Sequence, residues 1–390
     1  MVMKKKNNKK IGILTLNGFS NYGNVLQNIA VQTFFENLEY EPETIWYSKF
    51  PANMNIINKL SSHLKKRDVL HTFASKIKSK FSTSSKALKE AEQKRQNAFE
   101  LFCKSNVKYS DIRLTEKNFK DNDIVKKINN EYISFFSGSD QVWGLDGKDY
   151  PEVFFLPFAE KEKRNSFAAS FGFSSIPNRN LIKDYQNGLN DMNAISVREY
   201  EGQSIINDIS NAHSTVLLDP VFLLNSDDWK KRMSPMNLKQ GNDFLLTYFL
   251  GEKTEEYNKI IKYISEKKGL EVINLNDIDN IDMFSISPDK YLYLFKSASY
   301  VVTDSFHGSA FSIIFKKNFL VLDRTDNMVN MSSRIKTLLS RTDLNERFFN
   351  NGTNLDEVLN YPNFDVSNSV IEKNVEDSKE FVKQALNNVR

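Results

Sequence analysis

The chain has 390 residues, of which 40% are hydrophobic and 26% charged, so we expect two globular domains and exclude disordered and low-complexity classes. A single cysteine, Cys103, excludes a disulfide scaffold and a cysteine-based zinc site, and the four histidines lack metalloprotease spacing. The formal net charge of +4 is too small to indicate nucleic-acid binding.

Short apolar runs alternate with helical patterns from the start of the chain. Residues 11–16 are a predicted strand, a polar loop spans 17–24, and apolar residues then recur at helical spacing up to Leu38. Further strands are predicted at 132–137, 165–170, 194–197 and 215–218. This alternation is typical of a parallel, doubly wound α/β domain.

Residues 53–105 interrupt the alternation and read as two amphipathic helices joined near 82–85. Within them, residues 59–95 hold eleven Lys or Arg and three acidic residues, a net charge of +8. We interpret this segment either as a solvated basic helical hairpin or as a surface that contacts anionic lipids.

A second series of elements follows Asp219-Pro220, which we expect to act as a hinge because proline restricts the residue before it. The predicted strands are 244–250, 271–275, 300–303 and 319–322. The predicted helices are 252–268, one that follows residues 304–308 and runs to about 316, 333–341 and 369–388. The expected fold class is therefore α/β, with two Rossmann-like domains facing a cleft. The first would span 1–220, with the helical insertion at about 53–105, and the second 221–390. A ligand is expected in the cleft, at the carboxyl ends of the strands.

Five lysines in the first ten residues precede the apolar run 11–16, which is too short for a signal peptide. No stretch approaches the ~18 apolar residues that a membrane-spanning helix needs. We expect a cytoplasmic protein, and the segment 59–95 suggests a peripheral position at the inner face of the cell membrane.

Three polar segments near strand ends of the first half are candidates for ligand binding. The loop 17–24 precedes a helix and either presents N–H groups to an anion or is a tight turn. Asp140 either accepts a hydroxyl proton or caps a helix. Arg198 either recognises a carboxylate or phosphate or forms an internal ion pair with Glu199.

Asp304-Ser305-Phe306-His307-Gly308 is the most suggestive segment of the second half. It lies between a predicted strand and a predicted helix. There Ser305 and the following N–H groups are able to bind an oxyanion, and His307 is able to transfer a proton near neutral pH. We interpret the remaining histidines as structural: His63, His71 and His213.

Taken in order, these segments resemble the polysaccharide pyruvyl transferase family. The resemblance spans about residues 11–340 and rests on Asn21-Tyr22-Gly23-Asn24-Val25-Leu26-Gln27, Gly138-Ser139-Asp140-Gln141-Val142-Trp143, Ser170-Phe171-Gly172, Ser196-Val197-Arg198-Glu199, Leu218-Asp219-Pro220 and Thr303-Asp304-Ser305-Phe306-His307-Gly308.

The resemblance implies a GT-B-like fold. It also implies transfer of the enolpyruvyl group of phosphoenolpyruvate to two hydroxyls of one sugar, giving a cyclic pyruvate ketal and phosphate. No cofactor and no metal ion are implied. The implied acceptor is a saccharide of a capsule or exopolysaccharide intermediate, lipid-linked at the membrane, and no nucleic acid is involved.

By the same resemblance, Arg198 holds the donor and His307 transfers a proton, which we assign to the departing phosphate. Asp140 is our own candidate for activating the acceptor hydroxyl. The further donor-binding candidates are Asn21, Gly23, Ser305, Gly308 and Arg334, and the acceptor-binding candidates are Gln141 and Trp143.

The chain departs from the family at one position. Several members have Ser-Arg-Leu-His where this chain has Asp304-Ser305-Phe306-His307, so Ser305 replaces an expected donor-binding arginine. Arg334 is our candidate to replace it. The departure keeps a sugar-nucleotide-dependent GT-B-type glycosyltransferase as an alternative. A third interpretation, a non-enzymatic basic adaptor or nucleic-acid binder, is opposed by the few aromatic residues in 59–95.

Overall fold

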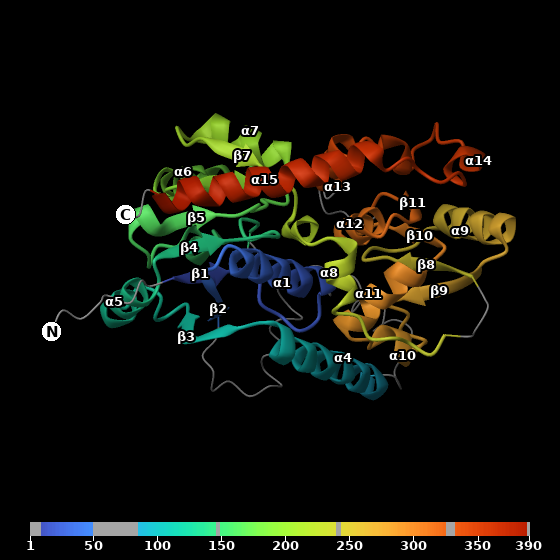
Figure 1. Ribbon diagram of the computed structural model, residues 1–390, viewed down its shortest axis with the longest axis horizontal. Helices are drawn as coiled ribbons and strands as arrows, with labels where there is room; N and C mark the ends of the chain where they lie inside the picture. The colour runs from blue at the N-terminus through green and yellow to red at the C-terminus, as the bar shows by residue number, and fades with distance from the viewer. Residues whose placement is uncertain (1–8, 50–84, 146–148, 239–242, 325–331, 388–390) are drawn as a thin grey trace.

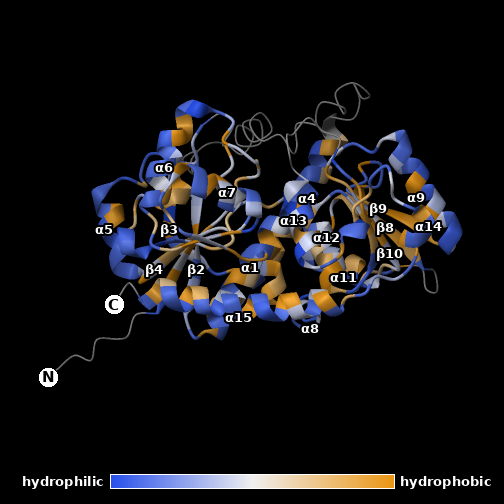
Figure 2. Ribbon diagram, turned by 90° about the horizontal axis from the view of Figure 1, so that it is seen from above, coloured by the Kyte–Doolittle hydropathy of each residue, from blue (hydrophilic) through white to orange (hydrophobic). Residues whose placement is uncertain are grey.

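The computed structural model describes residues 9–49, 85–145, 149–238, 243–324 and 332–387 (Figure 1). Its two main sheets are parallel throughout, with strand orders β3-β2-β1-β4-β5 and β11-β10-β8-β9. Figure 2 shows the corresponding two lobes, with the hydrophobic strands inside and polar helical faces outside. The predicted α/β class with two Rossmann-like units is confirmed.

The first sheet is built from β1 (Lys10–Leu14), β2 (Glu41–Ser48), β3 (Tyr109–Thr115), β4 (Ser134–Ser137) and β5 (Arg164–Ser166). A pair of parallel strands, β6 (Ile195–Val197) and β7 (Ser214–Val216), continues beside β5 through a bridge between Asn165 and Ala194. The strand order reverses between β1 and β4. Such a reversal opens a crevice at the carboxyl ends of the two strands, where ligands of open α/β sheets bind.

The second sheet contains β8 (Phe244–Tyr248), β9 (Glu271–Leu275), β10 (Tyr300–Thr303) and β11 (Asn318–Val321). Its order reverses between β8 and β10. All residues of β8, β10 and β11 are buried, as expected for parallel strands covered on both faces. The segment 304–308 follows β10 and therefore lies at the second reversal point.

Helices cover both sheets. They are α1 (Tyr22–Asn37), α4 (Ser85–Asn106), α5 (Asn122–Glu131), α6 (Ile182–Asn190), α7 (Tyr200–Ile209), α8 (Ser226–Lys230), α9 (Glu255–Lys268), α10 (Ile281–Phe284), α11 (Pro288–Ser297), α12 (Phe306–Ile314), α13 (Ser333–Arg341), α14 (Leu355–Val358) and α15 (Asp365–Asn387). No helix among the described residues is long and apolar enough to cross a membrane.

Two strands of the first sheet were missed by the sequence pattern. β2 begins with Glu-Pro-Glu, and proline is disfavoured inside a sheet, which hid the strand. In β3, Ile112 and Leu114 are buried while Asp111 and Arg113 are exposed, the alternation of a half-buried strand. β3 lies at the edge of the sheet, which explains its polar outer face.

Five predicted strands end one to four residues earlier than expected, and two of them illustrate the local changes. The strand predicted to reach residue 170 ends at Ser166, and Ala168 takes a left-handed φ of 48° that breaks the extended backbone. The strand predicted to reach 218 ends at Val216. The N–H of Leu218 donates instead to Oδ1 of Asn374, 2.7 Å away on α15.

Only part of the predicted insertion 53–105 can be described. Residues 50–84, with His63, His71 and most of the basic segment, lie outside the described residues. Arg95 on α4 is buried, and its Nη1 donates to Oδ1 of Asn276 (2.8 Å) and to the carbonyl of Phe284 (2.7 Å). Its Nη2 donates to the carbonyl of Ser20 (2.9 Å). This member of the basic segment therefore joins α4 to the second lobe and does not face a membrane.

The lobes share a hydrophobic core centred on α1. The ring of Tyr22 stacks on that of Tyr291 at a centroid distance of 4.3 Å, and its hydroxyl donates to the carbonyl of Ile286 (3.0 Å). Helix α15 runs along both lobes, and Phe381 and Val382 pack against the first sheet (Figures 1 and 2). The boundary proposed at residue 220 lies between the sheets, although the chain after it returns to the first lobe through α15.

Candidate functional site

Six charged or titratable side chains are buried where the lobes meet. We call them the inter-lobe cluster: Asp140, Arg198, Glu199, Asp219, His307 and Arg334. The first four follow strands β4, β6 and β7, and His307 lies in the first turn of α12, after β10. The cluster thus forms at the carboxyl ends of strands from both halves of the chain, where the sequence placed its candidate residues.

Arg198 is the centre of the cluster. Its Nη1 donates to Oδ2 of Asp219 (2.6 Å) and its Nη2 to Oδ1 of Asp140 (3.3 Å). Its guanidinium carbon lies 4.3 Å from the ring centroid of Phe306, which comes from the second lobe. Nε lies 3.8 Å from Oε2 of Glu199, so the predicted internal pair with Glu199 is looser than the two aspartate contacts. Buried carboxylates therefore hold the guanidinium in one orientation.

Asp219 joins this arginine to His307. Its Oδ2 lies 3.6 Å from Nε2 of His307 and accepts a hydrogen bond from the Ser139 hydroxyl (3.2 Å), while Oδ1 accepts the N–H of Val221 (3.1 Å). Burial opposes ionisation of Asp219, but His307, Arg198 and the Val221 N–H outweigh it and hold its pKa well below the usual range. Asp219 therefore stays a carboxylate, an acceptor only.

Asp140 was expected to activate a hydroxyl. Burial favours its neutral form, yet the positive charges of Arg198, His307 and Arg334 prevail and lower its pKa below the ordinary value. A general base works best with a pKa near the working pH. The ion pair therefore weakens the role of base and favours a role in holding Arg198.

The pKa of Glu199 is shifted in the opposite direction to that of Asp140. Its Oε1 accepts bonds from the Ser170 hydroxyl (2.8 Å) and the Phe171 N–H (3.1 Å), whereas Oε2 is buried without a hydrogen-bond partner. Burial is the largest effect and raises the pKa, against the attraction of Arg198 and Arg334. Glu199 thus holds its proton more tightly in the folded chain than in the unfolded one.

This shift predicts a pH-dependent stability. Because the folded pKa exceeds the ordinary 4.5, the contribution of Glu199 is fully present below that pH and is lost as pH rises through the folded pKa. We expect Glu199→Gln to melt progressively higher relative to the unaltered protein as pH rises from 4.5 toward neutrality. Melting curves across this range test it, with the exposed Glu376→Gln as control. A difference that does not change with pH would contradict the expectation.

Arg334 lies at the start of α13 and is buried. Burial and the neighbouring charge of Arg198 lower its pKa to about 10, while Asp140 and Glu199 act in the opposite direction. These electrostatic contacts bring Arg334 into the cluster. The arginine that the sequence nominated to replace Ser305 is therefore near Arg198.

The amino-terminal end of α1 faces His307. A Cβ built on Gly23 would lie 2.0 Å from Nδ1 of His307, so only glycine permits this approach. Asn21 is the N-cap of α1, and its Oδ1 accepts the N–H of Asn24 (3.3 Å). The loop that the sequence offered as an anion site thus ends beside the histidine.

A hydrogen bond joins Ser305 and Gly308. Ser305 is the N-cap of α12, and its Oγ accepts the Gly308 N–H at 3.3 Å. A Cβ on Gly308 would lie 2.5 Å from Oγ1 of Thr303, which explains the glycine. Both residues therefore position the first turn of α12, and with it His307.

The two acceptor-binding candidates, Gln141 and Trp143, lie in different surroundings. Trp143 is fully buried, stacks on Phe155 at 5.1 Å and donates from Nε1 to the carbonyl of Phe154 (3.3 Å). Its ring belongs to the core of the first lobe and cannot contact an acceptor, which corrects the prediction. Gln141 packs against Gly172, where an added Cβ would lie 2.0 Å from its Nε2.

Sequence reasoning gave Asp219 no chemical role. It treated Asp219-Pro220 as a hinge, whereas Pro220 starts a short 3-10 helix, Pro220–Leu223, that Asp219 caps. An aspartate directly after a predicted strand, 215–218, at the same sheet edge as Arg198, was the available signal. Within the described residues, no group of three His, Cys, Asp or Glu side chains is suited to hold a metal ion.

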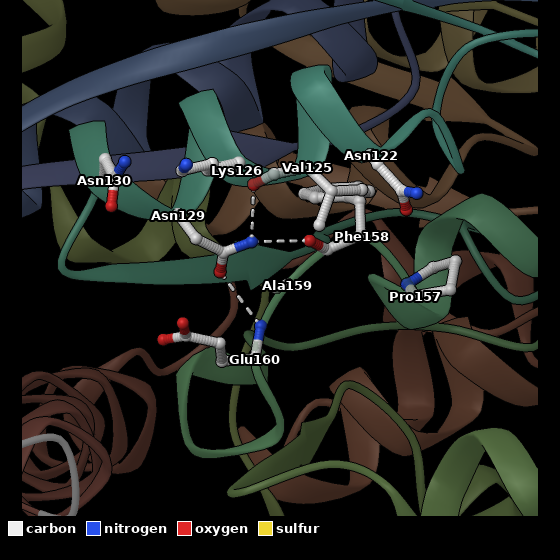
Figure 3. Close-up of a pocket in the computed structure, with 9 residues that line it drawn as sticks. All are labelled: Asn122, Val125, Lys126, Asn129, Asn130, Pro157, Phe158, Ala159 and Glu160. Carbon is white, nitrogen blue, oxygen red and sulfur yellow. Dashed lines mark hydrogen bonds between the residues drawn. The ribbon is translucent and has the colours of Figure 1, made fainter.

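A separate pocket of about 260 Å³ lies between α5 and residues 157–160 (Figure 3). Asn129 crosses it: Nδ2 donates to the carbonyls of Val125 (2.8 Å) and Phe158 (2.7 Å), and Oδ1 accepts the Glu160 N–H (2.9 Å). No member of the inter-lobe cluster lines this pocket. The Asn129 amide already has hydrogen-bond partners within the protein, so this pocket is not the candidate site.

Comparisons with known proteins gave one family and only distant structural neighbours. No curated protein matches the chain. Among solved structures, UDP-GlcNAc 2-epimerase from Methanocaldococcus jannaschii is 13% identical, with a TM-score of 0.47 and 90% of each chain covered. A glycosyltransferase from Rickettsia africae is 12% identical, with a TM-score of 0.42, over 96% of this chain and 99% of that chain. Likenesses this weak transfer no activity to this chain.

The profile of one protein family, described as polysaccharide pyruvyl transferase, matches residues 21–327. That range is most of the chain and includes the Gly23 segment, Asp140, Arg198, Asp219 and His307. This chain is a transferase that belongs to the polysaccharide pyruvyl transferase family.

Proposed function

We propose that the protein transfers the enolpyruvyl group of phosphoenolpyruvate to two hydroxyls of one sugar in a surface-glycan intermediate. The products are a cyclic pyruvate ketal and phosphate. The observation that carries the proposal is the burial of two arginines, Arg198 and Arg334, in the same inter-lobe cluster as His307, where all three act on the Asp140 carboxylate. A donor with a carboxylate and a phosphate needs such groups.

The reaction balances without an external reagent. One proton adds to the donor methylene, and a sugar hydroxyl bonds to the adjacent carbon as it loses its own proton. The bond from that carbon to the phosphate oxygen then breaks, and the second hydroxyl closes the ketal. The two hydroxyl protons end on the new methyl group and on the departing phosphate.

In this proposal His307 delivers the proton to the phosphate, and Arg334 supplies the donor contact that Ser305 lacks. Arg198 contributes positive charge from a fixed position, because Asp219 and Asp140 already bind its terminal nitrogens. Asn21 and Gly23 bring the amino-terminal end of α1, the positive end of the helix dipole, to the same place.

The first test is a thermal-shift titration with phosphoenolpyruvate, because a ligand that binds only the folded state raises the melting temperature. We expect a shift with phosphoenolpyruvate and none with UDP-, GDP- or CMP-sugars. Arg334→Ala should weaken the apparent affinity about tenfold or more, the loss of a charge-assisted contact. Lys336→Ala, on the same helix, is the matched control.

Release of phosphate in the presence of an acceptor glycan then tests the transfer itself. A shift with a sugar nucleotide alone would replace the proposal with the glycosyltransferase alternative. Unchanged donor affinity in Arg334→Ala would remove that residue from the donor site. The thermal shift reports donor binding alone, whereas phosphate release reports turnover. A variant that loses affinity is therefore distinguished from one that loses only turnover.

We further propose that the acceptor is lipid-linked and that basic residues of 59–95 meet anionic headgroups at the cytoplasmic face of the membrane. Flotation with anionic liposomes tests this in a variant whose lysines between 59 and 80 are replaced by glutamine. Arg95 must be kept because it joins the lobes. Equal flotation of the variant and the unaltered protein would contradict a role of these lysines in membrane binding.

A further inference from the structure

The Asp219 carboxylate lies between an arginine of the first lobe and a histidine of the second. Oδ1 is anchored by the backbone N–H of Val221, and Oδ2 faces Arg198 at 2.6 Å and His307 Nε2 at 3.6 Å. Asp219 has no exposed surface. Water therefore does not compete for Oδ2, and its three proton-bearing neighbours, Arg198, His307 and Ser139, are all protein side chains.

This contact distinguishes the two nitrogens of the His307 ring. Nε2 is enclosed and makes no hydrogen bond within 3.5 Å, and the group that faces it is a carboxylate. A carboxylate only accepts, so the proton of a neutral ring is favoured on Nε2. Nδ1 then carries the lone pair, and it faces Gly23 at the amino-terminal end of α1.

Asp219 also restrains the ring indirectly. It holds Arg198, whose guanidinium lies 4.3 Å from the ring centroid of Phe306, the residue next to His307. A cation over an aromatic face is attractive, more so when both are desolvated. The first turn of α12 is thus fixed by the carboxylate directly and through Arg198.

We propose that Asp219 is a positioning residue that keeps His307 in the Nε2–H form, so that Nδ1 is the nitrogen that exchanges a proton with the substrate. The identity of that substrate rests on the proposed function. The tautomer does not, because it follows from contacts within the chain.

The test is long-range ¹H–¹⁵N correlation spectroscopy of the full-length protein labelled with ¹⁵N-histidine. The chain has four histidines, and the His307 signals are those missing from His307→Gln. At a pH where the ring is neutral, we expect the pattern of a protonated Nε2 and an unprotonated Nδ1. The opposite pattern in the unaltered protein would overturn the proposal, whatever any variant does.

Asp219→Asn is the informative variant, because the amide either donates or accepts and no longer selects one tautomer. We expect mixed or reversed His307 signals and a fall in the turnover of phosphoenolpyruvate on the order of 10⁴-fold, typical of a misdirected imidazole. Ser139→Ala is the control, since it removes another hydrogen bond to Oδ2 and leaves the charge in place. Unchanged His307 signals in a folded Asp219→Asn protein would contradict the role.

The two proposals fail in different ways. An Nε2–H signal without any response to phosphoenolpyruvate would refute the proposed donor and leave the role of Asp219 intact. Turnover of phosphoenolpyruvate with a wild-type Nδ1–H signal would refute the role of Asp219 alone.

Discussion

Arg198→Met is expected to lower the free energy of unfolding by about 3–5 kcal/mol, because it leaves buried carboxylates without their partner. Asp219 and Asp140 both bind the guanidinium, and neither is accessible enough for water to replace it. Methionine keeps most of the apolar volume of the side chain. Chemical unfolding measures the loss, and Lys379→Met, which breaks an exposed ion pair with Glu376, should change little.

A second substitution tests the cause of this loss. In the Arg198→Met background, Asp219→Asn removes one of the stranded charges and should recover part of the stability. In the unaltered background the same Asp219→Asn should be destabilising, because there it strands Arg198 instead. Additive effects of the two substitutions would show that the ion pair is not what holds this region together.

Gly23→Ala is expected to reduce transfer by about 10²-fold or more, since a misplacement near 1 Å at a reacting group has effects of this size. The added Cβ would lie 2.0 Å from Nδ1 of His307, and the ring is enclosed on its other side by Asp219. The forced movement should also cost about 1–3 kcal/mol of stability, as overpacking does. Activity and melting temperature are the measurements.

The neighbouring loop offers a matched control. Gly18 has nothing within 4 Å of an added Cβ, so Gly18→Ala should leave activity and stability close to the original values. In the double variant Gly23→Ala/His307→Ala the clash is absent. Its loss of stability should therefore be smaller than the sum of the losses in the two single variants, while activity stays lost. Normal activity of Gly23→Ala would show that His307 tolerates displacement and does not act at this position.

Much of the candidate site was predictable because its residues lie at strand ends. Asp140, Arg198 and His307 each follow a short apolar run, and parallel strands bring their carboxyl ends to one edge. Trp143 was misplaced because an aromatic residue next to a polar segment serves a core as well as a sugar, and sequence alone does not show which. Arg334 lies in helix α13 and was nominated only by the loss of the family arginine.

The sequence by itself determined the parallel α/β fold, the family, and which side chains stand at the strand ends, since these follow from local periodicity and short motifs. Only the tertiary structure decided how those side chains are paired. Arg198 donates hydrogen bonds to Asp219 and Asp140 and lies farther from its sequence neighbour Glu199. Asp219 in turn lies next to His307 of the other lobe. Such contacts join residues far apart in the chain, and they depend on how the shared core around α1 sets one lobe against the other.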